Sequence, residues 1–265
     1  MNILITNDDG YAAKGIHILA EMMCQFGNVT VIAPKRHQSG MGMAVSLSQN
    51  LLTYKELPEE KYGKWSYLDA TPASCIKYGF NFEFKDKHPD IVVCGINHGS
   101  NASSASCYSG TLGAAAEAAL NGVPAIGVSI DNINDDADFS PVEKYFPEIF
   151  KLLVSNPPDK YGIFYNVNFP DIPSDEIKGV RVGHQGVGKW VNEFRKLDRN
   201  SFPGIGIGEI PYRMVGDYSD GQNTETADHH IMAKGCISIV PESLDRTDYE
   251  ECQRLISIDF NKDFR

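Results

Sequence analysis

The chain has 265 residues, a net charge of -11 and a hydrophobic fraction of 42%, which predict one large α/β domain with a sizeable core. The acidic balance argues against a stable nucleic-acid partner, because such partners need a basic surface. No apolar run approaches the ~20 residues of a membrane-spanning helix, and the N-terminus lacks the pattern of a signal peptide, so we expect a cytoplasmic protein without a membrane partner.

The first sixteen residues combine a buried strand with two adjacent carboxylates. The apolar run Asn2–Thr6 predicts a central parallel strand, and Asn7-Asp8-Asp9-Gly10 follows it directly. Open α/β sheets bind ligands outside the carboxyl ends of their strands, so Asp8 and Asp9 are candidates for a metal or phosphate site. The alternative is an Asx-turn that only ends the strand, since Asn, Asp and Gly are common turn formers.

The rest of the chain alternates between helix and strand patterns. Apolar residues at helical spacing predict a helix over 17–26, and a strand over 28–33 completes a βαβ unit with a right-handed crossover. The remaining predicted strands lie at 65–68, 91–94, 125–129, 164–169, 177–182 and 236–240, with one or two more in 45–54 around a turn at 48–50. The remaining predicted helices lie at 72–80, with Thr71 as N-cap, and at 111–120, 141–154 and 249–255.

The loop after the second predicted strand carries a hydroxyl that can approach the two carboxylates. It covers residues 35–43 and contains Ser39 in a Ser-Gly bend. Because loops that follow neighbouring parallel strands lie side by side, Ser39 can face Asp8 and Asp9. A solvated surface turn is the expected role of the cationic residues Lys35, Arg36 and His37.

A long loop of small residues leads from the strand at 91–94 into a helix. It runs from Gly95 to Thr111, and a loop of this length inside a compact domain is usually functional or disordered. Ser109, Gly110 and Thr111 open the helix, where hydroxyls, backbone N–H groups and the positive end of the helix dipole form a ready anion site. The alternative is an ordinary Ser/Thr cap.

Residues 184–228 lose helical periodicity and become rich in glycine, asparagine and aromatic residues. We expect extended hairpins in this segment. Its aromatic side chains have little helical core to bury them, so the segment is predicted to pack on a partner subunit. These side chains include Trp190, Phe194, Phe202 and Tyr212.

Two other patterns suggest sites but are poor candidates. Asp228-His229-His230 looks like a metal cluster, yet it stands without the other acids that a phosphoesterase site needs, so we expect a structural role. The glycine-rich run from Gly204 to Gly208 lies outside any βαβ unit, so it is not expected to bind a dinucleotide.

Several stretches of the chain, taken in order, resemble the SurE family of stationary-phase survival proteins, which are metal-dependent nucleoside monophosphate phosphatases. They are Ile3–Gly10, Ala33-Pro34, Gln38-Ser39-Gly40, Thr71-Pro72, Gly95-Ile96-Asn97, Tyr108–Thr111, Asn166–Pro170, Asp228 and Gly235 with Ser238-Ile239. The resemblance implies a three-layer, doubly wound, Rossmann-like α/β fold with a mixed sheet. It also implies a single domain over 1–265, in which the hairpin-rich segment 184–228 is exchanged between subunits of a homodimer or homotetramer.

By this resemblance, Asp8, Asp9, Ser39 and Asn97 correspond to the metal ligands. All four offer oxygen, which suits one divalent ion per subunit, Mg²⁺ or Mn²⁺ with Ca²⁺ as an alternative, rather than zinc. The chain departs from the family where relatives usually carry acids, at Ser74, Ser103 and Ser104, and where they carry an aromatic residue, at Cys236. None of these four is a metal ligand by the resemblance, so they bear on substrate preference and loop order.

The expected reaction is hydrolysis of nucleoside 5'- or 3'-monophosphates. Adjacent residues of a regular strand point to opposite faces, so Asp8 and Asp9 can share one ion only if the strand ends before them. Both acids would then hold the cation, which predicts direct attack by a metal-oriented water, with Asp8 as base and no phospho-enzyme. Asn97 and Ser109–Thr111 would hold phosphate oxygens. Two alternatives remain open: a nucleotide- or metal-binding module without turnover, and an aspartyl-phosphate-forming phosphatase of another substrate class.

Overall fold

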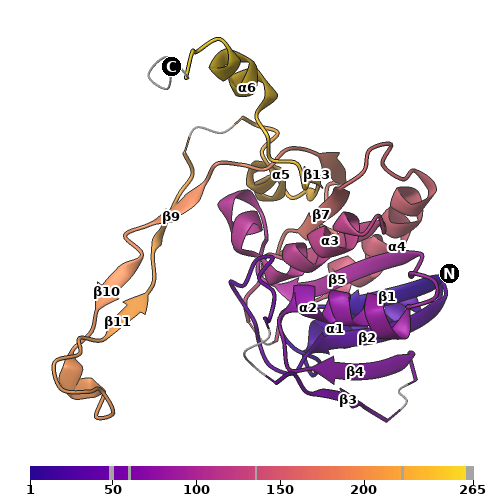
Figure 1. Cartoon of the computed structure of the whole chain (residues 1–265), viewed down its shortest axis with the longest axis horizontal. Coiled ribbons are helices and arrows are strands. Elements are labelled where there is room, and N and C mark those ends of the chain that lie inside the picture. Colours follow the sequence, from indigo (N-terminus) through magenta and orange to yellow (C-terminus); the bar gives the residue numbers. More distant parts are fainter. Residues whose placement is uncertain (48–50, 59–60, 135, 222–223, 261–265) are drawn as a thin grey trace.

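The structure is a computed structural model that describes residues 1–47, 51–58, 61–134, 136–221 and 224–260. A nine-stranded sheet forms its centre, in the order β3-β4-β2-β1-β5-β6-β7-β13-β8 (Figure 1). The strands are β1 (Asn2–Thr6), β2 (Asn28–Pro34), β3 (Tyr54–Glu56), β4 (Lys64–Leu68), β5 (Ile91–His98), β6 (Ala125–Ile130), β7 (Ile163–Phe169), β8 (Val180–Val182) and β13 (Ile237–Ser243). β3 and β13 run antiparallel to β4 and β7, so the predicted mixed sheet is confirmed.

Helices cover both faces of this sheet. They are α1 (Lys14–Met23), α2 (Pro72–Tyr78), α3 (Gly110–Leu120), α4 (Ser140–Ser155) and α5 (Asp228–Ala233). A further helix, α6 (Tyr249–Ile256), has no buried residues and lies apart from the sheet (Figure 1). One apolar core lies under α1 and α4 and a second lies under α2 and α3. Alternate residues of β1 enter the two cores, with Ile3 and Ile5 in the first and Leu4 in the second. The predicted three-layer arrangement is therefore confirmed.

Four predicted elements were placed wrongly in part. β5 continues to His98, into the loop predicted from Gly95, and β8 begins at Val180 rather than at 177. The first helix spans Lys14–Met23 rather than 17–26, because Gly15 packs closely on the Ile96 carbonyl while Gly27 packs on the backbone of Met1. Residues 45–47 and 51–53 form no strand, and only Tyr54 of the predicted 45–54 region lies in β3. The predicted turn at 48–50 lies outside the described residues.

The backbone of residues 44–46 is held by side chains instead of by a neighbouring strand. The Thr71 hydroxyl donates to the Ala44 carbonyl over 2.7 Å, and the Ser46 N–H donates to the Ser74 hydroxyl over 2.8 Å. Thr71 also caps α2, as predicted, by accepting from the Ser74 N–H. These bonds fix the loop after β2 on the start of α2.

The described residues of the predicted hairpin segment, 184–221 and 224–228, form an arm that extends away from the body (Figure 1). It contains two antiparallel pairs, β9 (Lys189–Val191) with β12 (Asp217–Ser219) and β10 (Phe194–Lys196) with β11 (Tyr212–Met214). The predicted hairpins are confirmed. The short helix α5, which follows the arm, was not predicted.

Among the described residues, every helix is too short or too polar to cross a membrane.

Candidate active site

Asp8 and Asp9 lie in a turn beyond the end of β1, which stops at Thr6. The Asn7 side chain closes this turn: its Nδ2 donates to the Gly10 carbonyl over 3.0 Å, and its Oδ1 accepts from the Gly10 N–H over 3.2 Å. Gly10 has a φ of +100°, which L side chains rarely adopt. Because the strand has already ended, the two carboxylates are not forced to opposite faces.

Asp8 is the more enclosed of the two acids, with 3% of its surface exposed. Its Oδ1 accepts a 2.7 Å hydrogen bond from the Thr111 hydroxyl in the first turn of α3. Gly110 lies so close that an added Cβ would stand 2.9 Å from Asp8 Oδ2. Burial, reinforced by the neighbouring Asp9 charge, raises the pKa of Asp8 to about 6 despite the bond from Thr111. Because burial disfavours the negative charge of Asp8, a nearby cation would stabilise the ionised form of this carboxylate.

Asp9 stands between two histidines. The backbone N–H and the Nδ1 atom of His98 both lie 3.3 Å from Asp9 Oδ2. On the other side, His37 Nδ1 lies 3.4 Å from Asp9 Oδ1. The His37 side chain is 62% exposed, as expected of a solvated surface turn, and its contact with Asp9 adds to that expectation. His98 was missed, although its place beside Asn97 in the loop was a usable signal.

The loops after β1 and β2 lie side by side, as predicted. The Gln38 N–H donates to the Asp8 carbonyl over 2.7 Å, and the Tyr11 N–H donates to the Pro34 carbonyl over 2.9 Å. Ser39 follows Gln38 directly and has an exposed side chain. The loop that carries Ser39 is thus fixed on the Asp8 backbone. In the same loop, Lys35 and Arg36 form ion pairs with Asp69 rather than remaining only solvated.

Asn97 comes from β5, the strand on the other side of β1. Its Nδ2 donates to the Gly99 carbonyl over 2.7 Å, which leaves Oδ1 as the atom that can coordinate a cation. Ser109 caps α3 by accepting from the Leu112 N–H over 3.1 Å. The Thr111 hydroxyl therefore donates within the protein, whereas the Ser109 O–H donor and the N–H groups of Gly110 and Thr111 are the groups suited to an anion.

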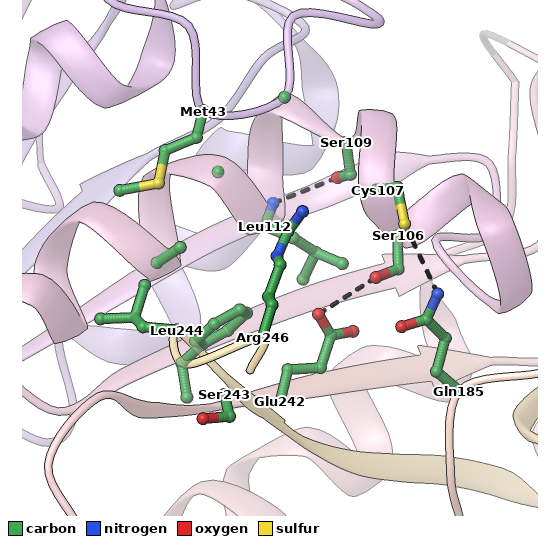
Figure 2. A pocket seen from close by; sticks show the side chains of 14 residues that line it. Met43, Ser106, Cys107, Ser109, Leu112, Gln185, Glu242, Ser243, Leu244 and Arg246 are labelled. Atoms are coloured by element: carbon green, nitrogen blue, oxygen red, sulfur yellow. Dashed lines mark hydrogen bonds between the residues drawn. The ribbon is translucent and has the colours of Figure 1, made fainter. Parts of the chain in front are cut away.

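A cavity of about 410 Å³ opens beside Ser109 (Figure 2). Apolar side chains line part of it, and Glu242 and Arg246 add charges. Ser106 donates to Glu242 over 3.0 Å on one wall. The apolar lining includes Met43, Leu112, Phe164 and Leu244. The position of Ser109, next to the glycine that touches Asp8, brings this cavity to the edge of the acidic site.

Comparison with known protein families identifies the family to which this chain belongs. A family model described as survival protein SurE matches residues 3–192. The chain belongs to this family. A protein named 5'-nucleotidase SurE from Christiangramia forsetii is 37% identical over 98% of this chain and 97% of its own length. Another of that name, from Cytophaga hutchinsonii, is 39% identical over 94% of this chain and 93% of its own.

The fold agrees with a solved structure of the same family. The crystal structure of the SurE protein from Aquifex aeolicus matches with a TM-score of 0.80 and 28% identity, over 96% of this chain and 98% of that chain. The resemblance inferred from the sequence motifs is thereby confirmed across almost the full length.

The serines that depart from the SurE pattern have structural partners. The Ser103 N–H donates to Asp228 Oδ2 over 2.9 Å, and the Ser104 N–H donates to the Gly188 carbonyl over 3.2 Å. Asp228 is fully buried and also accepts from the Gly186 N–H over 3.1 Å. The expected structural role of Asp228 is confirmed, and it joins the loop before α3 to the start of the arm.

Proposed function

We propose that this SurE-family chain is a metal-dependent phosphomonoesterase that hydrolyses nucleoside 5'- or 3'-monophosphates to nucleoside and phosphate. The observation that carries the proposal is the contact of Asp8, which follows the central strand next to Asp9, with the first turn of α3. It places paired carboxylates beside an anion-binding helix terminus. The names of the relatives support the nucleotide as substrate.

The proposed metal ligands are Asp8, Asp9, Ser39 and Asn97. The residues fit a hard divalent cation, because two carboxylates, a hydroxyl and an amide carbonyl are oxygen donors, and because the burial of Asp8 disfavours its charge without a counter-ion. A bound Mg²⁺ or Mn²⁺ would orient a water molecule and offset the charge that develops on the phosphoryl group. His98 and His37 restrain the Asp9 carboxylate for this role.

Asp8 is the proposed general base. Burial raises the pKa of Asp8 in the metal-free chain, which makes this carboxylate a better proton acceptor than an exposed one. Thr111 fixes its Oδ1, which leaves Oδ2 for a hydrogen bond to the attacking water. The N–H groups of Gly110 and Thr111, with Asn97, would hold the phosphate oxygens. Since both acids serve the cation and the water, no phospho-enzyme forms.

The cavity beside Ser109 is the proposed place of the nucleoside. Its volume of about 410 Å³ is in the range of small-molecule sites, and its walls combine apolar side chains with a few polar groups. We further propose that the arm packs on a second copy of the chain in a homodimer or homotetramer, because it exposes large apolar side chains far from the body's core.

A phosphate-release panel tests the proposal. Chelator-stripped protein is assayed on nucleoside 5'- and 3'-monophosphates and on sugar phosphates, with Mg²⁺, with Mn²⁺ and without added metal. We expect release from nucleotides that depends on metal and that falls sharply in Asp8→Asn and Asp9→Asn. Undiminished release after full metal removal contradicts the proposed site.

The same preparations, with and without added metal, distinguish the proposed phosphatase from the two alternative functions. A binding module gives no release from any substrate while nucleotide affinity, measured by calorimetry, persists. An aspartyl-phosphate enzyme traps labelled phosphate on protein after rapid acid quench. We expect no trapped phosphate, and no heavy-oxygen label in Asp8 after a single turnover in labelled water.

A further inference from the structure

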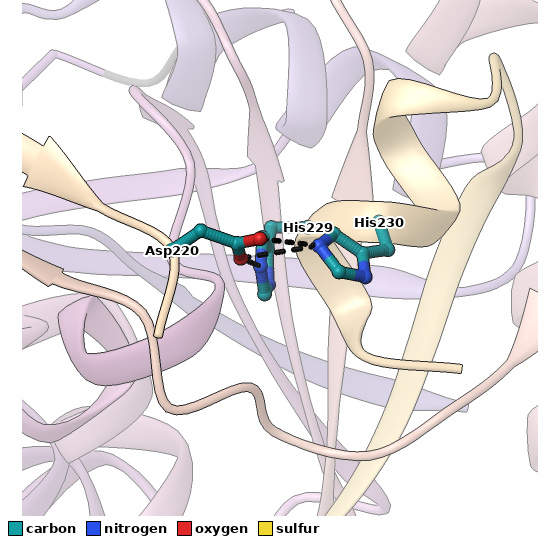
Figure 3. Close-up of side chains that lie close together, drawn as sticks. All are labelled: Asp220, His229 and His230. Atoms are coloured by element: carbon teal, nitrogen blue, oxygen red, sulfur yellow. Dashed lines mark hydrogen bonds and ion pairs between the residues drawn. The ribbon is translucent and has the colours of Figure 1, made fainter. Parts of the chain in front are cut away.

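A second cluster of metal-ligating side chains lies at the base of the arm, apart from the acidic site. Asp220 follows β12, while His229 and His230 belong to α5 (Figure 3). One donor atom from each residue can be chosen so that all three lie within 4.8 Å of one another. The sequence pointed to Asp228-His229-His230, but the structure buries Asp228 elsewhere and brings Asp220 to the histidines.

Both imidazoles turn the same nitrogen toward the same carboxylate. His229 Nε2 lies 2.6 Å from Asp220 Oδ1, and His230 Nε2 lies 3.0 Å from Asp220 Oδ2. Three ligands of a tetrahedral Zn²⁺, at bond lengths of ~2.0 Å, stand about 3.3 Å apart. The two nitrogen-to-carboxylate separations therefore need to grow by less than about 1 Å for one ion to replace the protons that now join these groups.

The opposite ring nitrogens are held in the way that metal-binding histidines require. His230 Nδ1 lies 2.9 Å from the Thr224 carbonyl, which can only accept, so Nδ1 carries the proton. His229 Nδ1 lies 2.7 Å from the Ser103 hydroxyl and 3.3 Å from the buried Asp228 carboxylate. A proton on Nδ1 leaves the Nε2 lone pair for a metal, and such partners fix ring orientation.

From this geometry we infer that Asp220, His229 and His230 form a second metal site, selective for Zn²⁺ or a similar borderline divalent ion. Two imidazole nitrogens and one carboxylate favour such ions over Mg²⁺, which suits the oxygen ligands of the acidic site. The exposure of the side chains, 52% for Asp220, 15% for His229 and 28% for His230, lets water complete the coordination. The ion would fasten the returning strand of the arm to α5.

Zinc titration of tag-free, chelator-stripped protein by calorimetry tests this site without reference to phosphatase activity. The titration is repeated in an Asp8→Asn background, which disables the acidic site. We expect one zinc-binding event per chain that persists in Asp8→Asn and weakens at least tenfold in His229→Gln, His230→Gln and Asp220→Asn. His184→Gln is the matched control, because His184 bonds to the Thr224 hydroxyl but stands outside the cluster.

The outcomes separate a metal site from a set of ion pairs. The melting temperature of each metal-free variant verifies that it is folded, and zinc should raise it in the parent, in Asp8→Asn and in His184→Gln but not in the three cluster variants. Absence of zinc binding in the parent overturns the inference. So does binding that disappears in Asp8→Asn and is unchanged in His230→Gln, because the ion then occupies the acidic site.

Discussion

The acidic site and the arm are built in opposite ways. Asp8 is 3% exposed and lies between paired central strands and the start of a helix. The arm consists of three-residue strands, and its Trp190 and Phe194 side chains are 53% and 70% exposed. Exposed apolar groups on this scale are typical of interaction surfaces. The acidic residues of the body are thus packed within one chain, whereas the arm exposes the apolar surface on which the proposed assembly rests.

The largest expected effect of a single substitution falls on the acidic site. Asp8→Asn should lower phosphate release at least ~100-fold, because it removes both a metal ligand and the general base. The melting temperature should not fall, since the substitution removes a buried charge. In the arm, Asp198→Asn is the control, because Asn also caps the turn that Asp198 caps. Equal losses of phosphate release in Asp8→Asn and Asp198→Asn would contradict the proposed contrast between the acidic site and the arm.

Removal of the arm should change assembly rather than folding. Replacement of residues 189–219 by a short Gly-Ser linker keeps Asp228, which the body needs to hold the Ser103 and Gly186 backbones. We expect light scattering to show a shift from oligomer to monomer, or to aggregates. A well-behaved oligomer of unchanged size after this deletion would contradict the role of the arm in assembly.

A pair of glycine substitutions compares packing in the two regions. Gly110→Ala places a Cβ 2.8 Å from Asp8 Cβ, so it should destabilise the fold by about 1–3 kcal/mol and lower activity. Gly204→Ala, in the arm, meets nothing within 4 Å and should do neither. Chemical denaturation measures the stability of each variant, and phosphate release measures its activity. A Gly110→Ala variant as stable and active as the parent would mean that the Asp8 site is loosely packed.

The smallest expected effect is on the pH dependence of stability. Burial raises the pKa of Glu242 above its ordinary value of 4.5 although Asn166 and Ser106 donate to it. The folded state therefore binds the Glu242 proton more tightly than the unfolded state does. The resulting contribution to the free energy of unfolding is fully present below pH 4.5, and it is lost as the pH rises through the pKa of the folded state. Glu242→Gln should flatten this decline in unfolding free energy. An unchanged slope would show that Glu242 is well solvated.

The sequence was most informative where chemistry and local structure coincide. Asp8 and Asp9 come just after β1, so their position along the chain was enough to place them at the carboxyl end of this central strand. The contacts of His37 and His98 with Asp9 depend on how three loops pack, which no periodicity encodes. The apolar pattern over 45–54 predicted strands, but side chains of α2 bind that backbone instead.

The base of the arm was the hardest region to predict. The six residues of α5 are too few to show helical periodicity, and Asp220 is brought to the histidines only by the return of the hairpin. The sequence therefore gave no signal that Asp220 lies beside the two histidines, and a structural role was expected for Asp228-His229-His230. Asp228, which is adjacent in sequence, is buried against the Ser103 and Gly186 backbones instead.

The two ends of the arm leave the body at neighbouring points, where His184 and Ala227 form a bridge and the Asp228 N–H donates to the His184 carbonyl over 3.0 Å. A segment with adjoining ends can be lengthened, shortened or exchanged at little entropic cost, since the closure term grows only slowly with loop length. The arm can therefore be exchanged for that of a relative while Asp8 and Asp9 stay in place, which would separate its proposed role in assembly from the proposed catalysis.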